Sequence, residues 1–199
     1  MTPFTEVTGA AIPLPMDDVN TDQIIPSKYL KDLHADLAEG FLAFQRRRPD
    51  GSVIADCVLE RPVFRGAPIL VVGANFGCGS SREHAVWAMQ AYGIRCVLGH
   101  QLAEFFVDNC LKNGVLPIDL DAEAHRDFLQ AVQRADGALP VCVDLRQCEI
   151  RGLGDARLGF AIDPQQRRIL LEGLDEIAMS LQHLAAIEAW ERQHQSPRA

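Results

Sequence analysis

The chain of 199 residues lacks the cysteine spacing, the positive charge and the long apolar runs that mark several common classes of protein. No two of its six cysteines are two or three positions apart, so the ligand spacing of zinc-ribbon and ferredoxin-type sites is missing. Asp and Glu outnumber Lys and Arg by 27 to 19, the opposite of what a non-specific nucleic-acid or anionic-membrane binder needs. No apolar run approaches the roughly 20 residues of a membrane span, and residues 1–16 do not resemble a signal peptide. These absences predict a cytoplasmic protein with free thiols and no metal ligands of its own.

The composition is that of an ordinary globular chain, with 48% apolar and 23% charged residues. Residues 68–73 form a continuous apolar run, typical of a strand that is covered on both faces. The pattern then predicts, in order, a helix over 82–92, a strand over 94–98, a helix over 102–113 and a strand over 115–118. This order predicts a βαβαβ unit with a parallel sheet.

The segments around this unit have shorter and weaker patterns. Before it, we expect a strand over 7–14, helical structure in parts of 29–44, a mobile basic loop at 46–51 and a short strand at 57–59. After it, we expect a helix over 122–135, short antiparallel strands at 141–145, 148–151 and 158–162, and one or two amphipathic helices over 177–192. The predicted fold class is α/β, with helices around a mixed sheet.

The glycine-rich loop over residues 73–81 carries the residue types of an anion site. It lies where α/β proteins bind ligands, at the carboxyl end of a parallel strand and before a helix N-terminus. Ser80 or Ser81 is a natural N-cap. Arg82 in the first helical turn is locally unfavourable, so its placement suggests that its guanidinium binds a carboxylate or phosphate. The alternative is a glycine-rich turn with a capping serine and a surface arginine. The loop is neither a P-loop nor a dinucleotide-binding fingerprint.

Residues 75–85, Asn-Phe-Gly-Cys-Gly-Ser-Ser-Arg-Glu-His-Ala, strongly resemble the signature of the small subunits of 3-isopropylmalate dehydratase, a family of aconitase-superfamily hydro-lyases. Residues 19–26, 108–118 and 162–177 resemble further segments of the same family, in the same order. The resemblance implies a single swivelling β/β/α domain, as in the aconitase C-terminal domain, over residues 1–199, with a C-terminal helical tail over residues 177–195.

The resemblance also implies an activity. The family isomerises 2-isopropylmalate and 3-isopropylmalate, in leucine biosynthesis, by removing and re-adding water through an alkene. It implies that a large subunit carries a [4Fe-4S] cluster, that this chain binds no cofactor itself, and that it is active only with that partner. By match to the motif, Ser80 is the proton-transferring base and Arg82 holds a substrate carboxylate. Ser81 donates a hydrogen bond to the same carboxylate or caps the helix.

Other candidate residues have supporting or specificity roles. Thr21 and Asp22 are expected to face the site, although an Asx-turn explains them almost as well, and Gly79 and Cys78 belong to the loop that supports Ser80. The side chains expected to contact the variable part of the substrate, or else simply to cover the core, are Lys28, Tyr29 and Leu30.

Two departures from the family pattern leave the substrate open. Asn20 stands where many members have Asp, and residues 99–104 replace a Ser-Phe-Ala-Asp-type stretch. A mismatch of one methylene discriminates by only about 1–3 kcal/mol, so a related hydro-lyase acting on dimethylmalate, citramalate or citraconate, or a homoaconitate-type substrate remains an alternative. A stand-alone dicarboxylate-binding module is a second one.

Overall fold

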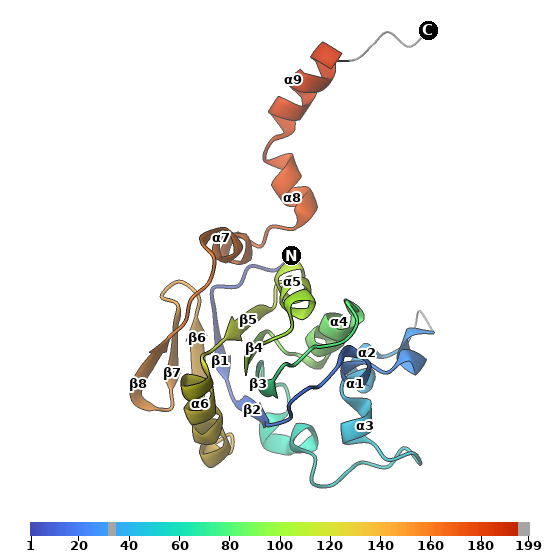
Figure 1. Cartoon of the computed structure of the whole chain (residues 1–199), viewed down its shortest axis with the longest axis vertical. Coiled ribbons are helices and arrows are strands. Elements are labelled where there is room, and N and C mark those ends of the chain that lie inside the picture. Colours follow the sequence, from blue (N-terminus) through green and yellow to red (C-terminus); the bar gives the residue numbers. More distant parts are fainter. Residues whose placement is uncertain (32–34, 195–199) are drawn as a thin grey trace.

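The computed structural model of the chain describes residues 1–31 and 35–194 (Figure 1). Two four-stranded sheets organise this part of the chain. The parallel sheet has the order β2-β3-β4-β5, formed by Ala11–Leu14, Ile69–Ala74, Cys96–His100 and Leu116–Asp119. The antiparallel sheet has the order β1-β6-β7-β8, formed by Glu6–Gly9, Val141–Asp144, Glu149–Gly152 and Gly154–Gly159. The parallel and antiparallel portions indicated by the sequence therefore lie in separate sheets.

The parallel sheet is buried on both faces. Leu70 and Val72 of β3 belong to one apolar cluster, with α4 (His84–Tyr92) and part of α5 (Glu104–Lys112). The alternate residues Ile69 and Val71 belong to a second cluster, with α6 (Ala122–Ala135) and the antiparallel sheet. Because side chains alternate across a strand, this division confirms the prediction of a doubly covered strand and of the βαβαβ unit. Figure 1 shows α6 and α4 on opposite sides of the sheet.

Several predicted boundaries are wrong outside this unit. The strand expected over 7–14 is two strands, because the chain crosses from one sheet to the other at Ala10. The strand expected at 57–59 is a 3-10 turn, Val58–Glu60. The strand expected over 158–162 ends at Gly159, and α7 (Pro164–Glu172), capped by Asp163, is a helix that the patterns did not predict.

The segment expected to be partly helical over 29–44 is a chain of short turns. A 3-10 turn spans Ser27–Leu30, residues 32–34 lie outside the described part, and α2 (Leu37–Gly40) and α3 (Ala43–Arg46) have one turn each. A short helix, α1 (Thr21–Ile24), precedes them. Leu42, with φ 47°, separates α2 from α3. Left-handed backbone at a leucine interrupts a helix, which explains why apolar spacing alone misled the prediction.

Arg46 anchors this irregular segment. Its side chain is 94% buried and donates to Glu60 Oε1 at 2.6 Å and to the carbonyls of Ala38 and Phe41 at 2.7 and 3.0 Å. Its guanidinium also lies over the ring of Tyr92, 4.9 Å from the centroid. The expectation of a mobile basic loop at 46–51 is therefore wrong for Arg46, which is buried, whereas Arg48 is exposed.

The C-terminal helices α8 (Glu176–Leu181) and α9 (Leu184–His194) extend away from the sheets (Figure 1). They confirm the helical tail predicted over 177–192. Their apolar residues Ile177, Leu181, Leu184 and Trp190 are exposed. Among the described residues, no helix is both long and apolar enough to cross a membrane.

Replacing Arg46 with alanine should destabilise the protein strongly. The substitution removes three hydrogen bonds and leaves Glu60 without its closest cation, and breaking such a pair costs about 3 kcal/mol of unfolding free energy. Urea unfolding followed by circular dichroism measures the change. Arg48→Ala is the matched control, because an exposed arginine contributes less than about 1 kcal/mol. Equal losses in the two variants would contradict the anchoring role.

Stability should also fall at alkaline pH. Burial raises the pKa of the Cys96 and Cys110 thiols above the ordinary value of 9.0. Above that pH the unfolded chain loses protons that the folded chain keeps, so the free energy of unfolding falls as the pH rises. Urea midpoints measured from pH 7 to about pH 10.5 should show this fall, and a Cys96→Ala, Cys110→Ala variant should show a shallower one. An unchanged slope in that variant would rule the explanation out.

Candidate active site

The loop after β3 is bound to the segment before α1. The amide of Asp18 donates to Ala74 O at 2.9 Å, and the amide of Gly77 donates to Val19 O at 2.8 Å. Asn20 and Cys78 form an isolated parallel bridge, in which the amide of Thr21 donates to Cys78 O at 3.0 Å. The two segments lie next to each other because β2 and β3 are parallel neighbours whose carboxyl ends meet at one edge. Cys78 thus supports the site through its backbone.

Gly77 is required at its position for two reasons. Its φ of 82° lies in the left-handed region, which favours glycine. A Cβ atom there would also lie 2.2 Å from the ring of Phe106, a buried residue of α5. Gly79, with φ 90°, makes the second turn and leads into Ser80. The glycines therefore fold the loop closely over α5 and bring the next residues to the surface.

Ser80 and Thr21 form the central polar contact of the site. Their hydroxyl oxygens are 2.9 Å apart, and either can donate. Thr21 is buried and Ser80 is exposed, so a buried hydroxyl holds the one that faces solvent. The structure brings together two residues that sequence analysis placed at the site from segments 59 positions apart.

Asn20 fixes the direction of Thr21 and Asp22. Its side chain accepts from the amide of Gln23 at 2.9 Å, and the Gln23 side chain accepts from the amide of Asn20 at 2.8 Å. This reciprocal capping box begins α1. The Asn in place of the expected Asp is therefore a competent N-cap, since the two residue types cap helices about equally well.

Arg82 is held by α1 on one edge of its guanidinium. Its Nη1 forms an ion pair with Asp22 Oδ1 at 2.5 Å and donates to Ile25 O at 3.2 Å. Arg82 is 21% exposed and Asp22 is 65% exposed. Neither Nη2 nor Nε of Arg82 donates to a residue in the described part of the chain. The arrangement orients the guanidinium and leaves an edge that can bind a carboxylate.

The helix after this loop begins later than predicted. Its first residue is His84, and Glu83 stands at the N-cap without a side-chain hydrogen bond. The expectation that Ser80 or Ser81 caps the helix is therefore wrong, and Arg82 precedes the first turn instead of lying in it. We call residues 80–83 the serine–arginine segment. The physical reason is that Thr21 and Asp22 bind the side chains of Ser80 and Arg82 and hold the segment outside the helix.

Sequence reasoning missed two residues that contact the serine–arginine segment. Asn109 donates to Ser81 O at 3.2 Å, and Asn113 donates to Glu83 Oε1 at 2.8 Å. The spacing of two asparagines by four positions, which places them on one face of a helix, was the available signal.

The expected specificity residues lie elsewhere. Tyr29 and Leu30 pack against the apolar core, and Lys28 Nζ lies 4.9 Å from the centroid of the Tyr29 ring and 5.8 Å from that of Phe44. Lys28 and Tyr29 line a cavity of about 550 Å³ together with Phe44 and Arg47. A role for these three residues in substrate recognition stays a prediction.

The described residues contain no group of three or more His, Cys, Asp or Glu side chains that could hold a metal ion. Cys96 and Cys110 are fully buried in the apolar clusters, so they do not present thiolates to the surface. These two thiols therefore do not fit the ligand set of an iron–sulfur cluster.

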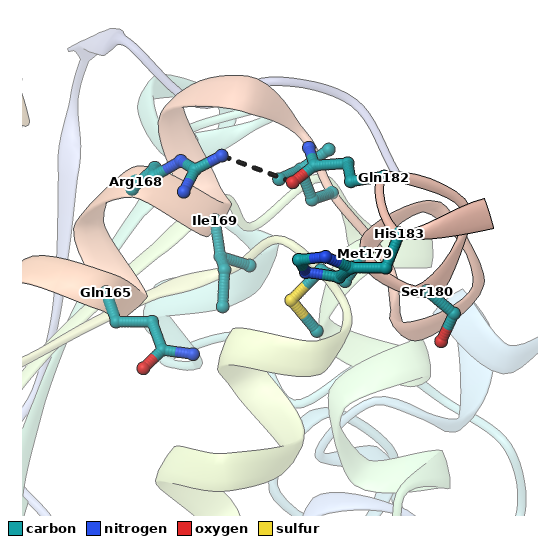
Figure 2. Close-up of a pocket in the computed structure, with 8 residues that line it drawn as sticks. Gln165, Arg168, Ile169, Met179, Ser180, Gln182 and His183 are labelled. Carbon is teal, nitrogen blue, oxygen red and sulfur yellow. Dashed lines mark hydrogen bonds between the residues drawn. The ribbon is translucent and has the colours of Figure 1, made fainter. Parts of the chain in front are cut away.

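A separate hollow lies between α7 and α8. Figure 2 shows Arg168 of α7 donating to Gln182, at 3.2 Å, across one end of it, with Ile169 and Met179 inside. Its lining residues all lie between 165 and 183. This hollow is therefore distinct from the candidate site at Ser80.

Comparison with known proteins identifies the family. The model of the aconitase C-terminal domain matches residues 1–123. The 3-isopropylmalate dehydratase small subunit of Agrobacterium fabrum is 42% identical over 199 residues, covering 100% of this chain and 98% of that protein. The subunit of the same name from Paramagnetospirillum magneticum is 45% identical, with coverage of 96% and 95%.

A solved structure supports the same assignment. The crystal structure of 3-isopropylmalate dehydratase from Methanocaldococcus jannaschii is 26% identical and superposes with a TM-score of 0.66, covering 92% of this chain and 99% of that one. The family and the fold expected from residues 75–85 are thus confirmed. The chain belongs to the aconitase C-terminal domain family and, within it, to the small subunits of 3-isopropylmalate dehydratase.

Proposed function

We propose that this chain is the half of a hydro-lyase that moves the proton and binds a substrate carboxylate, and that the substrates are 2-isopropylmalate and 3-isopropylmalate of leucine biosynthesis. The contact between Ser80 Oγ and Thr21 Oγ1, beside the anchored guanidinium of Arg82, carries the proposal. A serine base and a guanidinium at the edge of a parallel sheet are what the abstraction of a proton next to a carboxylate requires.

Ser80 acts as its alkoxide. The alkoxide takes the proton from carbon, the electron pair of that C–H bond forms the alkene, and the C–O bond breaks so that the hydroxyl group leaves and, once protonated, becomes water. Re-addition of water with the opposite regiochemistry gives the isomer. Serine is a weak acid, so the anion needs donors already in position. Thr21 supplies one of them at 2.9 Å.

Arg82 contributes charge and orientation. Asp22 and Ile25 O occupy Nη1, so the guanidinium is oriented before the substrate arrives. Its remaining edge can bind a carboxylate with two parallel hydrogen bonds, which fixes both the position and the rotation of the substrate. Ser81, which is exposed beside it, donates a further hydrogen bond to that carboxylate.

A partner completes the site. Gly79, Ser80 and Ser81 are all exposed, whereas proton abstraction from carbon needs a site that excludes water. We propose that the large subunit covers this surface and carries a [4Fe-4S] cluster, which supplies the Lewis acid for loss of the hydroxyl group. This chain supplies no ligands to that cluster, and its activity requires the partner.

Ser80→Ala should abolish turnover without unfolding the chain. The wild-type chain alone should be inactive, and mixing it with the large subunit should produce dehydration activity. Because the variant lacks the base, its kcat in the mixture should fall about a thousand-fold or more, while circular dichroism and the urea midpoint stay unchanged. Ser180→Ala, on the exposed helix α8, is the matched control. Full turnover by the isolated wild-type chain would refute the two-subunit site.

Arg82→Lys should weaken substrate binding more than it slows chemistry. Lysine keeps the charge but loses the planar pair of donors, so KM should rise about 10- to 100-fold, corresponding to 1.4–2.8 kcal/mol. The control is Arg61→Lys, which changes another surface Arg–Asp pair, that of Arg61 with Asp136. Steady-state kinetics of the reconstituted pair with a panel of substituted malates measures both variants. A preference for citramalate or dimethylmalate over 2-isopropylmalate would instead assign a related hydro-lyase activity.

A further inference from the structure

We propose that Asn109 and Asn113 are positioning residues for the serine–arginine segment. This inference rests on the proposed function, because it concerns how that segment is held for catalysis. Neither asparagine contacts Ser80 or Arg82 in the described contacts, and each acts through the residue next to one of them. Asn109 lies on α5 and Asn113 ends it.

The segment is held from two sides in strict alternation. Ser80 and Arg82 bind Thr21 and Asp22 of α1 through their side chains. Asn109 donates to the carbonyl of the intervening Ser81. Asn113 donates to the carboxylate of Glu83. Contacts to α1 therefore alternate along the segment with contacts to α5 and its C-cap residue. Contact with α1 alone would leave every second residue without a fixed position.

The amide group of Asn113 is fully used. Its Nδ2 donates to Glu83 Oε1 and to Asn109 O, both at 2.8 Å, and its Oδ1 accepts from Trp87 Nε1 at 3.0 Å. One side chain therefore joins the end of the serine–arginine segment, α5 and the first turns of α4. An amide with both donors and its acceptor engaged specifies one orientation, because rotating it would lose all three bonds.

Helix α5 is a rigid platform for this contact. Phe106 and Cys110 are buried in the apolar cluster on the α4 side of the parallel sheet. Leu111 is buried in the cluster on the opposite face of that sheet. The segment itself is not rigid alone, since it follows Gly79 and precedes the first helical residue, His84. Catalytic groups on loops need such support from packed elements, and a displacement of about 1 Å can cost 100-fold in rate.

Gln90 offers a control within the same interface. Its Nε2 donates to the backbone carbonyl of Asn113 at 2.5 Å. This bond joins α4 to the end of α5 but does not involve residues 80–83. Gln90→Ala therefore removes a contact between the two helices and leaves both bonds to the serine–arginine segment in place.

The test compares four variants in the complex with the large subunit. Asn113→Asp replaces the donor facing Glu83 with a carboxylate, so kcat should fall about 10- to 100-fold, with a smaller rise in KM because Arg82 keeps its bonds to α1. Glu83→Gln combined with Asn113→Asp restores a donor–acceptor pair with reversed polarity and should recover at least half of the lost kcat on a logarithmic scale. Asn109→Ala should lower kcat in the same direction, and Gln90→Ala should retain the wild-type kcat.

Hydrogen exchange on the isolated chain gives a second readout that needs no partner. In Asn113→Asp the amides of residues 80–83 should exchange about 10-fold faster, while those of β3 and β4 stay unchanged. A wild-type kcat in Asn113→Asp, no recovery in the double variant, or an equal loss in Gln90→Ala would overturn the inference. If the wild-type mixture shows no dehydration, the proposed function fails, and the exchange rates alone then decide whether the asparagines position the segment.

Discussion

The pairing between the chain before α1 and the loop after β3 is the constraint on which the site depends. Backbone bonds from Asp18, Gly77 and Thr21 join these two stretches at the carboxyl edge of the parallel sheet. The edge itself is fixed because alternate side chains of β3 pack into two different apolar clusters, so a one-residue shift in register would disrupt the packing of both. The hydroxyl oxygens of Thr21 and Ser80, one on each stretch, then lie 2.9 Å apart. The position of Ser80 is thus a consequence of core packing.

The geometry of the candidate site is what the proposed half-site requires. Its buried members, such as Thr21, serve to hold and orient, and its exposed members, Ser80 and Ser81, face outward. Arg82 is intermediate, with one edge engaged by Asp22 and the other open. The net charge of −8 does not prevent the site from binding an anion, because the oriented guanidinium of Arg82 attracts an anion locally. This division of labour suits a surface that a second polypeptide closes.

Anchoring recurs where the backbone is irregular. The described turns of residues 27–31 and 35–48 have only short helical pieces, yet one buried arginine joins α2, Glu60 and Tyr92. The serine–arginine segment is held in the same manner, by Thr21 and Asp22 on one side and two asparagines on the other. In both places polar side chains supply the order that helix or sheet hydrogen bonds would otherwise provide.

Sequence alone predicted the βαβαβ unit, α6 and the helical tail, because apolar periodicity is a local property. Short motifs also singled out the serine, the arginine and the Thr-Asp pair, which the structure brings together. It did not determine where α4 begins, that β1 and β2 belong to different sheets, or that Arg46 is buried. Nor did it show that Asn109 and Asn113 contact the serine–arginine segment. Each of these depends on partners distant in the chain, such as Asp22 for Arg82 or Glu60 for Arg46. Tertiary structure decided them because a polar side chain takes its role from the group it meets, and that group is set by packing.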